Sequence, residues 1–344
     1  LSGLVGSEMC IRDRAASPNG TWSGASYVVY GKNDTSPVDL ALIETTGNTG
    51  GFIIEGKAAN TFVGHSVSGA GDVNGDGYDD LVIGAYQADP NEPNAGASYV
   101  IYGRPDVGGN KIGTAVDLAA IIADTGGFVI NGELEDDQSG YSVSGAGDVN
   151  GDGFDDILIG ASGDGVGSSL VSQGRVYVFF GGDRTTLTGH GAWDLTSSGH
   201  TGFPIERGFR IEGDANFRGV GQSISGGFDL NDDGFDDFLI GVETDSKNGH
   251  VDDVGEAVLV YGTNEFDRSI LPLQNLAGKG GSMNPRGVIL ALKNKDGAGK
   301  KALLGLEMAA LDDVNGDGHD DIAVGAPQYG DGGAAFVIFG GIQY

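Results

Sequence analysis

The sequence predicts an all-β fold, a β-propeller of four-stranded blades, from three observations. The chain of 344 residues contains 65 glycines but only 9 prolines, which is typical of short strands joined by tight turns. An acidic, glycine-rich segment recurs four times, and each copy is followed by a short apolar run between Asp and Gly. The copies begin 76, 81 and 84 residues apart, at Asp72, Asp148, Asp229 and Asp313. Regular repetition of four short strands is the signature of propeller blades.

The strands of each unit follow from residue type. Small residues, as in Ser66–Gly71 and Ser142–Gly147, suit an innermost strand where blades crowd around an axis. The second strands are fully apolar runs typical of strands buried on both faces: Leu81–Ile83, Ile157–Ile159, Phe238–Ile240 and Ile322–Val324. The third strands are aromatic and β-branched: Tyr99–Tyr102, Val176–Phe180, Val258–Tyr261 and Phe336–Phe339. The fourth strands are Gly51–Gly56, Gly127–Gly132 and Gly208–Gly213, with a weaker match at 287–293. Between the third and fourth strands, Val116–Ile122 is long enough for one or two helical turns.

These strands divide the chain into about four blades and a partial one. We expect third and fourth strands of a partial blade in residues 15–63, the former including Tyr27–Tyr30. Blades follow at 64–139, 140–220 and 221–304, and a partial blade at 305–344. Residues 1–14 look foreign and are interpreted as a non-native or disordered N-terminus. An open arc, or a fragment of a larger propeller, is favoured over a small closed ring, in which the 27–30 strand would be surplus.

Each acidic segment has the form Asp-x-Asn-x-Asp-Gly-x-x-Asp, which turns oxygen atoms toward one point. Side chains at positions 1, 3, 5 and 9 and the carbonyl at position 7 are hard oxygen ligands, and glycine at position 6 permits the sharp turn. The sequence therefore predicts four Ca²⁺ sites, in loops 72–80, 148–156, 229–237 and 313–321. The predicted ligands are Asp72, Asn74, Asp76, Tyr78 and Asp80; Asp148, Asn150, Asp152, Phe154 and Asp156; Asp229, Asn231, Asp233, Phe235 and Asp237; Asp313, Asn315, Asp317, His319 and Asp321.

Other interpretations of these loops fit less well. An EF-hand needs a bidentate Glu at position 12, where the loops have aliphatic residues: Ile83, Ile159, Ile240 and Val324. A metal-free Asp/Asn-Gly turn explains one such loop better than four at the same spacing. The lack of soft donors disfavours zinc and copper, and a flexible ring that includes a carbonyl disfavours magnesium. His319 at position 7 is expected to ligate through its backbone, and Asp232 at position 4 adds charge without removing a ligand.

Composition excludes several classes of partner and site. The chain has 49 acidic and 19 basic residues, a formal charge of −30, which argues against nucleic acid and against anionic membranes. A single cysteine, Cys10, leaves no internal disulfide and no cysteine-based metal site. No apolar run approaches the roughly 18 residues of a membrane-spanning helix, and no signal peptide is readable.

The repeat resembles the FG-GAP repeat, the blade of the integrin α-subunit propeller and of its bacterial relatives. The FG glycines are Gly64, Gly140, Gly221 and Gly305, preceded by Val63, Ser139, Val220 and Leu304 instead of Phe. The GAP element occurs literally at Gly325–Pro327, whereas the third unit departs with Gly241-Val242-Glu243. The resemblance covers about residues 20–344. It implies a propeller of the seven-bladed type, with calcium on one face, partner contacts mostly on the other, and further blades of the same parent chain as neighbours.

The function expected from these features is that of a calcium-binding, non-catalytic module of a secreted or cell-surface protein. It would act in adhesion or as a scaffold, with an extracellular protein or glycan as ligand and without membrane insertion. The loops expected to recognise the ligand are 86–95, 162–173, 243–254, 57–63 and 133–139, because they differ between units.

Two alternatives remain open. The first is the accessory propeller of a secreted, phospholipase-like hydrolase, although Gly64–Ser68 is not a nucleophile elbow despite His65 beside Ser66. The five histidines do not recur at equivalent positions: His65, His190, His200, His250 and His319. The second alternative is a glycan-binding propeller in which Trp22 or Trp193 stacks on a sugar ring.

Overall fold

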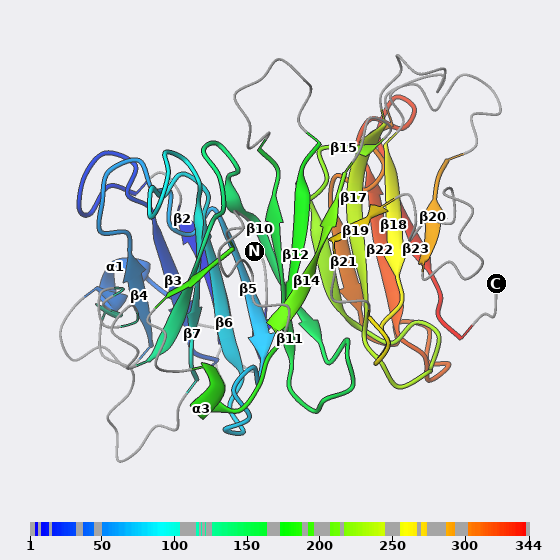
Figure 1. Ribbon diagram of the computed structural model, residues 1–344, viewed down its shortest axis with the longest axis horizontal. Helices are drawn as coiled ribbons and strands as arrows, with labels where there is room; N and C mark the ends of the chain where they lie inside the picture. Colours follow the sequence, from blue (N-terminus) through cyan, green and yellow to red (C-terminus); the bar gives the residue numbers. More distant parts are fainter. Residues whose placement is uncertain are drawn as a thin grey trace.

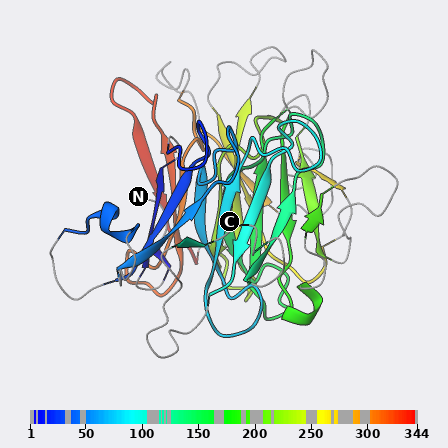
Figure 2. The same cartoon turned by 90° about the vertical axis from the view of Figure 1, so that its left-hand side faces the viewer.

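The computed structural model places the strands in five sheets that stand side by side (Figure 1). It describes residues 4–5, 8–13, 16–31, 37–44, 50–103, 115–116, 118, 121, 126–163, 173–187, 192–195, 207–213, 217–244, 255–266, 270–273, 287–292 and 302–341. Figure 2 shows that the row of sheets is curved, with the last sheet (red) to one side of the first (blue) and the third (green) to the other.

The first four sheets have antiparallel strands, and short outer strands extend the first three in parallel. The first contains β1 (Leu4–Val5), β2 (Glu8–Asp13), β3 (Ala25–Val29), β4 (Gly51–Glu55) and the parallel β8 (Ala115–Val116). The second contains β5 (Ser66–Gly71), β6 (Asp80–Ala85), β7 (Ala97–Ile101), β9 (Gly127–Asn131) and the parallel β13 (Ala192–Asp194). The third contains β10 (Ser139–Gly147), β11 (Asp156–Ala161), β12 (Arg175–Phe179), β14 (Gly208–Glu212) and the parallel β19 (Ile270–Pro272).

The remaining elements complete the arc. The fourth sheet contains β16 (Ile224–Phe228), β17 (Asp237–Thr244), β18 (Glu256–Val260) and β20 (Gly287–Leu290), with β15 (Phe217–Arg218) also beside β17. The fifth contains β21 (Met308–Leu311), β22 (Asp321–Ala326) and β23 (Ala334–Ile338). Two helices have described bounds, α1 (Leu40–Ile43) and α3 (Arg184–Leu187), and no helix in the described ranges is long and apolar enough to cross a membrane.

The predicted all-β fold of four-stranded blades in an open arc is confirmed. Within the described ranges, no strand of the fifth sheet pairs with a strand of the first. The second strands β6 and β11 are buried at every residue, as the apolar runs Leu81–Ile83 and Ile157–Ile159 predict, and the burial includes the aspartate that begins each strand. The core lies between successive sheets, where Phe128 of one sheet packs with Phe179 of the next.

The inner strands approach one another as closely as their small residues allow. A Cβ on Gly145 would lie 2.7 Å from the carbonyl oxygen of Gly69 on the neighbouring inner strand. Serines of each inner strand bond to the next: Ser66 Oγ accepts from Val143 N at 3.0 Å, and Ser142 Oγ donates to the Gly221 carbonyl at 2.8 Å. Small residues are therefore required at the axis by steric contact as well as favoured by hydrogen bonding.

Two segments differ from expectation. Residues 1–14 are predicted to be non-native or disordered, and within them Glu8–Asp13 forms β2 and pairs in register with β3. The short apolar run Met9–Ile11 between charged residues is compatible with a strand. In the segment 116–122, Ala115–Val116 forms a strand parallel to β4, and helical residues are described only at Leu118 and Ile121.

The short parallel strands join neighbouring sheets. Each of β8, β13 and β19 lies between the third and fourth strands of its own blade, yet pairs with the fourth strand of the preceding one. The chain therefore attaches each sheet to the one before it at the outer edge, while serines do so at the axis. Neighbouring sheets are thus connected at both their outer and inner edges. The loops between strands lie at the two ends of the blades, and the acidic segments are all at one of these ends.

Candidate metal-binding loops

The four acidic loops connect the first and second strands of the second to fifth sheets, along the lower edge in Figure 1. In the first loop, Asp76 N and Gly77 N donate to the Asp72 carboxylate at 3.0 and 2.8 Å. The equivalent bonds in the other loops are 2.8 to 3.1 Å long. The sixth-position glycines have φ values of 85°, 88°, 87° and 93°, a region that other residues rarely adopt. Each loop therefore curls around its first aspartate in the same way.

The ninth-position aspartates form the buried side of each loop. They begin the second strands and are 0% exposed: Asp80, Asp156, Asp237 and Asp321. Each accepts an N–H bond, 2.8 to 3.1 Å long, from a glycine just after the third strand: Gly103, Gly181, Gly262 and Gly340. A carboxylate is thus held under every loop by the backbone of a neighbouring strand.

Burial makes the carboxyl groups of Asp80, Asp156 and Asp237 hard to ionise. It raises the pKa of Asp80 to about 7 and that of Asp237 to about 8, and it raises the pKa of Asp156 well above the usual range. Hydrogen bonds oppose this effect in part, while the charges of Asp76 and Asp72 raise the pKa of Asp80 further. A buried carboxylate beside two like charges is stabilised by a nearby cation. The electrostatics of these loops therefore favour cation binding.

The third-position asparagines adopt two arrangements. Asn74 Nδ2 donates to the two carboxylate oxygens of Asp80 at 3.2 and 3.0 Å, and the second loop repeats this bond at 3.5 Å. Asn231 and Asn315 instead donate to the fifth-position aspartate, at 3.1 and 2.9 Å. Asn74 is 3% exposed, and its Oδ1 has no hydrogen-bond partner. A buried oxygen without a donor is unusual, and it fits a metal ligand.

The predicted ligands of each loop lie in one turn without forming a coordination sphere. The first-position carboxylate bonds to its own loop backbone, and the fifth accepts from the N–H of position 7 at 3.0 to 3.1 Å. Across the described parts of the chain, no group of three or more His, Cys, Asp or Glu side chains is arranged to hold a metal ion. The donor set is nevertheless made only of oxygen atoms, the kind that hard cations prefer.

The eighth position, absent from the predicted ligands, links one loop to the next. Asp155 Oδ2 accepts a hydrogen bond from Asp72 N, in the preceding loop, at 2.7 Å. The bond recurs at 2.7 and 3.1 Å at the next two junctions: from Asp148 N to Asp236 and from Asp229 N to Asp320. The sequence signal was an Asp-Asp doublet at the end of every loop, of which only the second residue was assigned a role. These aspartates connect the four loops into a chain.

The seventh-position side chains reinforce these links. The ring of Phe154 covers Gly75 of the preceding loop so closely that a Cβ there would lie 2.5 Å from it, and the next junction repeats this contact. His319, expected to contribute only its carbonyl, contacts Asp232 of the preceding loop through its imidazole. Loop-to-loop packing therefore accounts for the residue type at position 7.

Among the candidate catalytic and sugar-binding residues, His65, Ser66 and Trp193 contact neighbouring blades or the core, and Trp22 is exposed. His65 Nδ1 lies 3.0 Å from the Tyr141 carbonyl oxygen, and Ser66 Oγ accepts a backbone bond from the next blade. Trp193 is 9% exposed and packs in the core, whereas Trp22 is 52% exposed. Outside the described residues lie His190, His200, His250 and parts of two recognition loops, 164–172 and 245–254.

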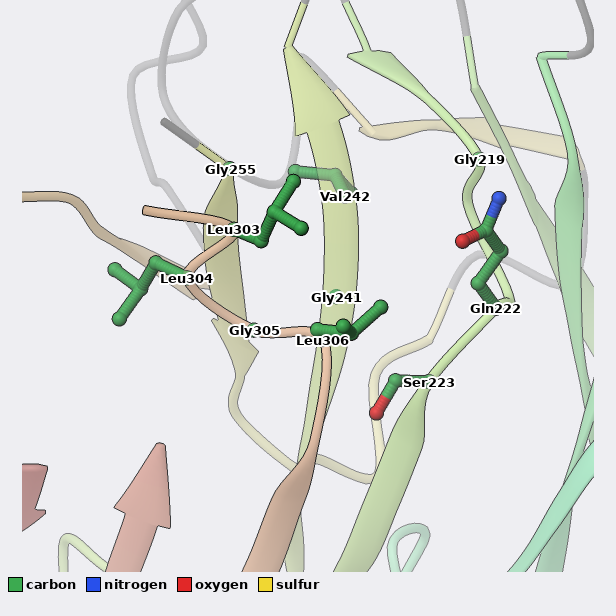
Figure 3. Close-up of a pocket in the computed structure, with 10 residues that line it drawn as sticks. All are labelled: Gly219, Gln222, Ser223, Gly241, Val242, Gly255, Leu303, Leu304, Gly305 and Leu306. Atoms are coloured by element: carbon green, nitrogen blue, oxygen red, sulfur yellow. The ribbon is translucent and has the colours of Figure 1, made fainter. Parts of the chain in front are cut away.

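A shallow pocket lies at the end of the blades opposite the acidic loops, between the fourth and fifth sheets (Figure 3). Its volume is about 290 Å³, including the part open to solvent. The walls are mostly glycine and aliphatic residues, among them Val242, Leu303 and Leu306. Its polar side chains are those of Gln222 and Ser223, and neither a base nor a carboxylate lines it. The lining supports apolar contact rather than acid–base chemistry.

A buried charge cluster joins the second and third sheets. Asp137 and Glu133 are 0% and 3% exposed, and both accept from the Tyr177 hydroxyl, at 3.3 and 2.8 Å. Arg175 pairs with Asp137 at 2.5 Å and Arg210 with Glu133 at 2.8 Å. Burial raises the pKa of Asp137 to about 6, although Arg175 opposes that rise. The two guanidinium groups also contact Glu212, at 3.6 and 3.0 Å, so they are shared among three carboxylates, which is the arrangement of a structural ion cluster.

Comparison with known proteins agrees with this architecture. The FG-GAP repeat family matches residues 63–101, 139–179 and 305–338. These stretches contain the first, second and fourth acidic loops with the strands on either side. The third loop lies outside them, in the unit that departs from the Gly-Ala-Pro pattern.

The similar curated proteins are integrin α subunits. Integrin alpha-5 of Xenopus laevis is 27% identical over 272 residues, 78% of this chain and 20% of that protein. Integrin alpha-3 of Cricetulus griseus is 28% identical over 194 residues, 56% of this chain and 15% of that protein. Integrin alpha pat-2 of Caenorhabditis elegans is 36% identical over 115 residues, 33% of this chain and 8% of that protein. The chain thus spans a fifth or less of each of these relatives. The three matched repeats, the open arc of blades and these similarities together support an integrin-α-like FG-GAP repeat protein.

Proposed function

We propose that this chain is a calcium-stabilised, non-catalytic propeller module that acts in adhesion or as a scaffold, outside cells or at their surface. The observation that carries the proposal is the fourfold recurrence of one loop geometry above a fully buried ninth-position carboxylate. Four independent copies of a turn that concentrates charge are difficult to explain by folding alone, because clustered carboxylates repel one another.

Calcium would be held by the five oxygen ligands assigned to each loop. Once bound, it supplies positive charge beside the buried carboxylate and a partner for buried oxygens such as Asn74 Oδ1. The hydrogen bonds of the loop would be retained when calcium binds. The first aspartate would still accept from the backbone of the turn, and the ninth would still accept from the glycine N–H. The role is structural, since each loop joins two strands of one blade and contacts the next.

The stabilisation expected from the metal is large enough to measure. Extracellular calcium modules bind with dissociation constants of about 0.1–1 mM. At 1 mM calcium, a site with a dissociation constant near 0.1 mM stabilises the folded state by roughly 1.4 kcal/mol. Four such sites would add several kcal/mol, a large part of the stability of an ordinary domain.

Thermal melting in decalcified buffer, with and without 1 mM CaCl₂, tests this function. We expect calcium to raise the melting temperature by about 5 °C or more, and magnesium at the same concentration to have a smaller effect. Asp72→Ala should reduce the calcium response. Glu92→Gln, at an exposed site away from the loops, serves as the control and should leave the response unchanged. Equal melting temperatures with and without calcium would refute the proposal.

The adhesive role and the location rest on similarity. The relatives are named as integrin α subunits, and the matched repeats include three of the four loops. A non-catalytic role is supported by the apolar lining of the pocket and by the pairing of the buried carboxylates Glu133 and Asp137 with arginines. A ligand would be an extracellular protein or glycan that contacts the face opposite the acidic loops.

A further inference from the structure

A row of aromatic rings crosses the junction of the first and second sheets, at the end of the blades opposite the acidic loops. Trp22 lies 5.7 Å from Phe62, which lies 5.4 Å from Tyr86, all between ring centroids. Tyr86 in turn is 4.4 Å from His65 and 5.5 Å from Tyr141. Trp22 is 52% exposed, while the other four rings are half-buried. The row therefore has one solvent-exposed indole, which packs beside half-buried aromatic rings.

The backbone fixes the two rings at the open end of the row. Trp22 and Phe62 have φ values of 56° and 52°, in the left-handed region. Phe62 N donates to the Trp22 carbonyl at 3.2 Å, and Asn60 N donates to the Thr21 carbonyl at 2.9 Å. Two hydrogen-bonded turns, one before β3 and one before β5, thus hold the indole next to the phenyl ring before any ligand arrives.

The next junction has the same backbone with different side chains. Asn94 and Gln138 occupy the equivalent positions, with φ values of 51° and 56°, and Gln138 N donates to the Asn94 carbonyl at 3.0 Å. There the Asn94 amide donates to Asp136 at 2.8 Å. The fold therefore accepts polar residues at these positions, and asparagine is among the residues best suited to a left-handed φ.

Tryptophan and phenylalanine at the first junction thus serve no requirement of the fold. A bulky residue in the left-handed region is an outlier, and such strain occurs preferentially at binding sites. The exposed indole also leaves apolar surface in water, which folding alone would disfavour. Both observations point to a ligand that covers Trp22 and Phe62.

We propose that Trp22, Phe62 and Tyr86 form a binding site for a pyranose ring of a neutral glycan. Aromatic rings offer an apolar face on which the C–H face of a sugar stacks, and the exposed amide of Asn60 in the same turn is suited to hydroxyl groups. A protein partner fits less well, because stable protein interfaces cover about 800 Å² on each side, whereas a single large ring is exposed here. The formal charge of −30 disfavours sulfated and other anionic glycans.

This inference rests on the proposed adhesive role, to which it gives a ligand class, but it does not depend on the metal ligands. The rings and the acidic loops lie at opposite ends of the strands, since Trp22 precedes a third strand and Phe62 a first strand. Calcium-dependent melting therefore reports on the loops, and sugar binding reports on the rings. Failure of either experiment is recognisable without the other.

The test uses the calcium-loaded protein on an array of neutral glycans, followed by titration of the strongest binder with tryptophan fluorescence as the signal. Of the two tryptophans, Trp22 is exposed and Trp193 is 9% exposed, so a change on binding reports on the first. We expect a neutral glycan to bind and a heparin tetrasaccharide not to bind. Saturation-transfer NMR should show contact between the sugar ring protons and the protein.

The matched variant is the double substitution Trp22→Asn and Phe62→Gln, which copies the second junction. It should keep its calcium-dependent melting and lose at least tenfold in glycan affinity, whereas Val38→Asn, at a residue 40% exposed elsewhere, should keep the affinity within twofold. If the double variant does not fold, the fluorescence and NMR signals of the unaltered protein decide. The proposal is overturned if no neutral glycan binds, if only an anionic glycan or a protein binds, or if the folded variant binds as tightly as the original.

Discussion

His319 contacts Asp232 across the junction of the third and fourth acidic loops, at the two positions where the earlier junctions pair a phenylalanine with a glycine. An aromatic ring over a glycine and an imidazole against a carboxylate are two solutions to the same packing problem. The glycine leaves room for the ring, while Asp232, with a φ of 56°, fills that space and supplies a charged partner. His319 at position 7 and Asp232 at position 4 each depart from the repeat, and the sequence shows them as unrelated changes. In the structure the two residues are in contact, so the two changes belong together.

This pairing predicts strong coupling between the two positions. At the first junction Gly75 leaves room for the ring of Phe154. At the third junction the Asp232 side chain fills the equivalent space, so the larger ring of His319→Phe would collide with it. We expect this variant to lose about 1–3 kcal/mol in the free energy of unfolding. Asp232→Gly should lose less, because it removes an exposed partner. The double variant recreates the earlier junctions and should recover most of the stability. Urea unfolding of all four proteins gives the coupling energy, and additive effects within about 0.5 kcal/mol would contradict the prediction.

The eighth-position aspartates predict that a loop is weakened from its neighbour. In Asp155→Ala the backbone N–H of Asp72 loses its 2.7 Å acceptor, which should cost about 1–3 kcal/mol. Asp79 holds the same repeat position but is exposed, so Asp79→Ala is the matched control and should cost less than 1 kcal/mol. Tyr78 is the only tyrosine at position 7, and Tyr261 precedes the glycine that bonds to Asp237 under the third loop. In a Tyr261→Phe background, terbium luminescence excited through tyrosine therefore reports on the first loop. Weaker terbium binding in Asp155→Ala, a substitution in the second loop, is expected; unchanged binding and stability would exclude the link.

The sequence predicted those parts of the fold that depend on local pattern. Fully apolar second strands, small inner strands and the turn of each acidic loop follow from residue type and from a spacing repeated four times. The role of Asp155 did not, because its partner Asp72 lies 83 residues earlier and the contact exists only once neighbouring blades are packed. The period of the repeat gave the distance between loops along the chain, but not which faces meet.

Other features escaped for different physical reasons. The two residues of β8 are too few to show any periodicity. Their pairing with β4 depends on how the second blade packs against the first sheet, which the local sequence does not encode. Glu133 and Asp137 could not be separated from the other 47 acidic residues until burial and the two arginines distinguished them. The sequence offers both Trp22 and Trp193 as sugar-stacking residues, and their different solvent exposure is visible only in the structure.

The raised pKa values predict how pH acts on the metal-free protein. Asp80 has a pKa of about 7 in the folded state against 3.8 as the ordinary value, so the folded state binds more protons between these limits. Its contribution to stability is therefore full below about pH 4 and is lost as pH rises through 7. Asp237, at about 8, acts in the same direction. In decalcified buffer the melting temperature should fall between pH 5 and pH 8, and 1 mM calcium should reduce that fall.

Asp80→Asn separates this titration from general charge repulsion. The amide cannot ionise, so at pH 8 without calcium the variant should melt at a higher temperature than the original protein. In 1 mM calcium the order should reverse, because the variant has lost a ligand. Glu92→Gln removes one exposed charge elsewhere and should change neither comparison. If Asp80→Asn were destabilising in both conditions by the same amount, the carboxylate would be a structural acceptor alone.

The buried charge cluster predicts a large penalty when one cation is removed. Arg175→Met would leave Asp137, which is 0% exposed, without its 2.5 Å partner, and removal of one member of a buried pair costs about 3–5 kcal/mol. Combining it with Asp137→Asn should recover part of this loss, because the uncompensated charge disappears. Arg184→Gln is the control, since this exposed arginine lies 5.3 Å from the centroid of the Tyr102 ring and its loss should cost less than 1 kcal/mol. Urea unfolding at pH 7 measures the free energy of unfolding of the single, double and control variants. If Arg175→Met cost no more than Arg184→Gln, solvent rather than Arg175 would stabilise the charge of Asp137, and the prediction would be wrong.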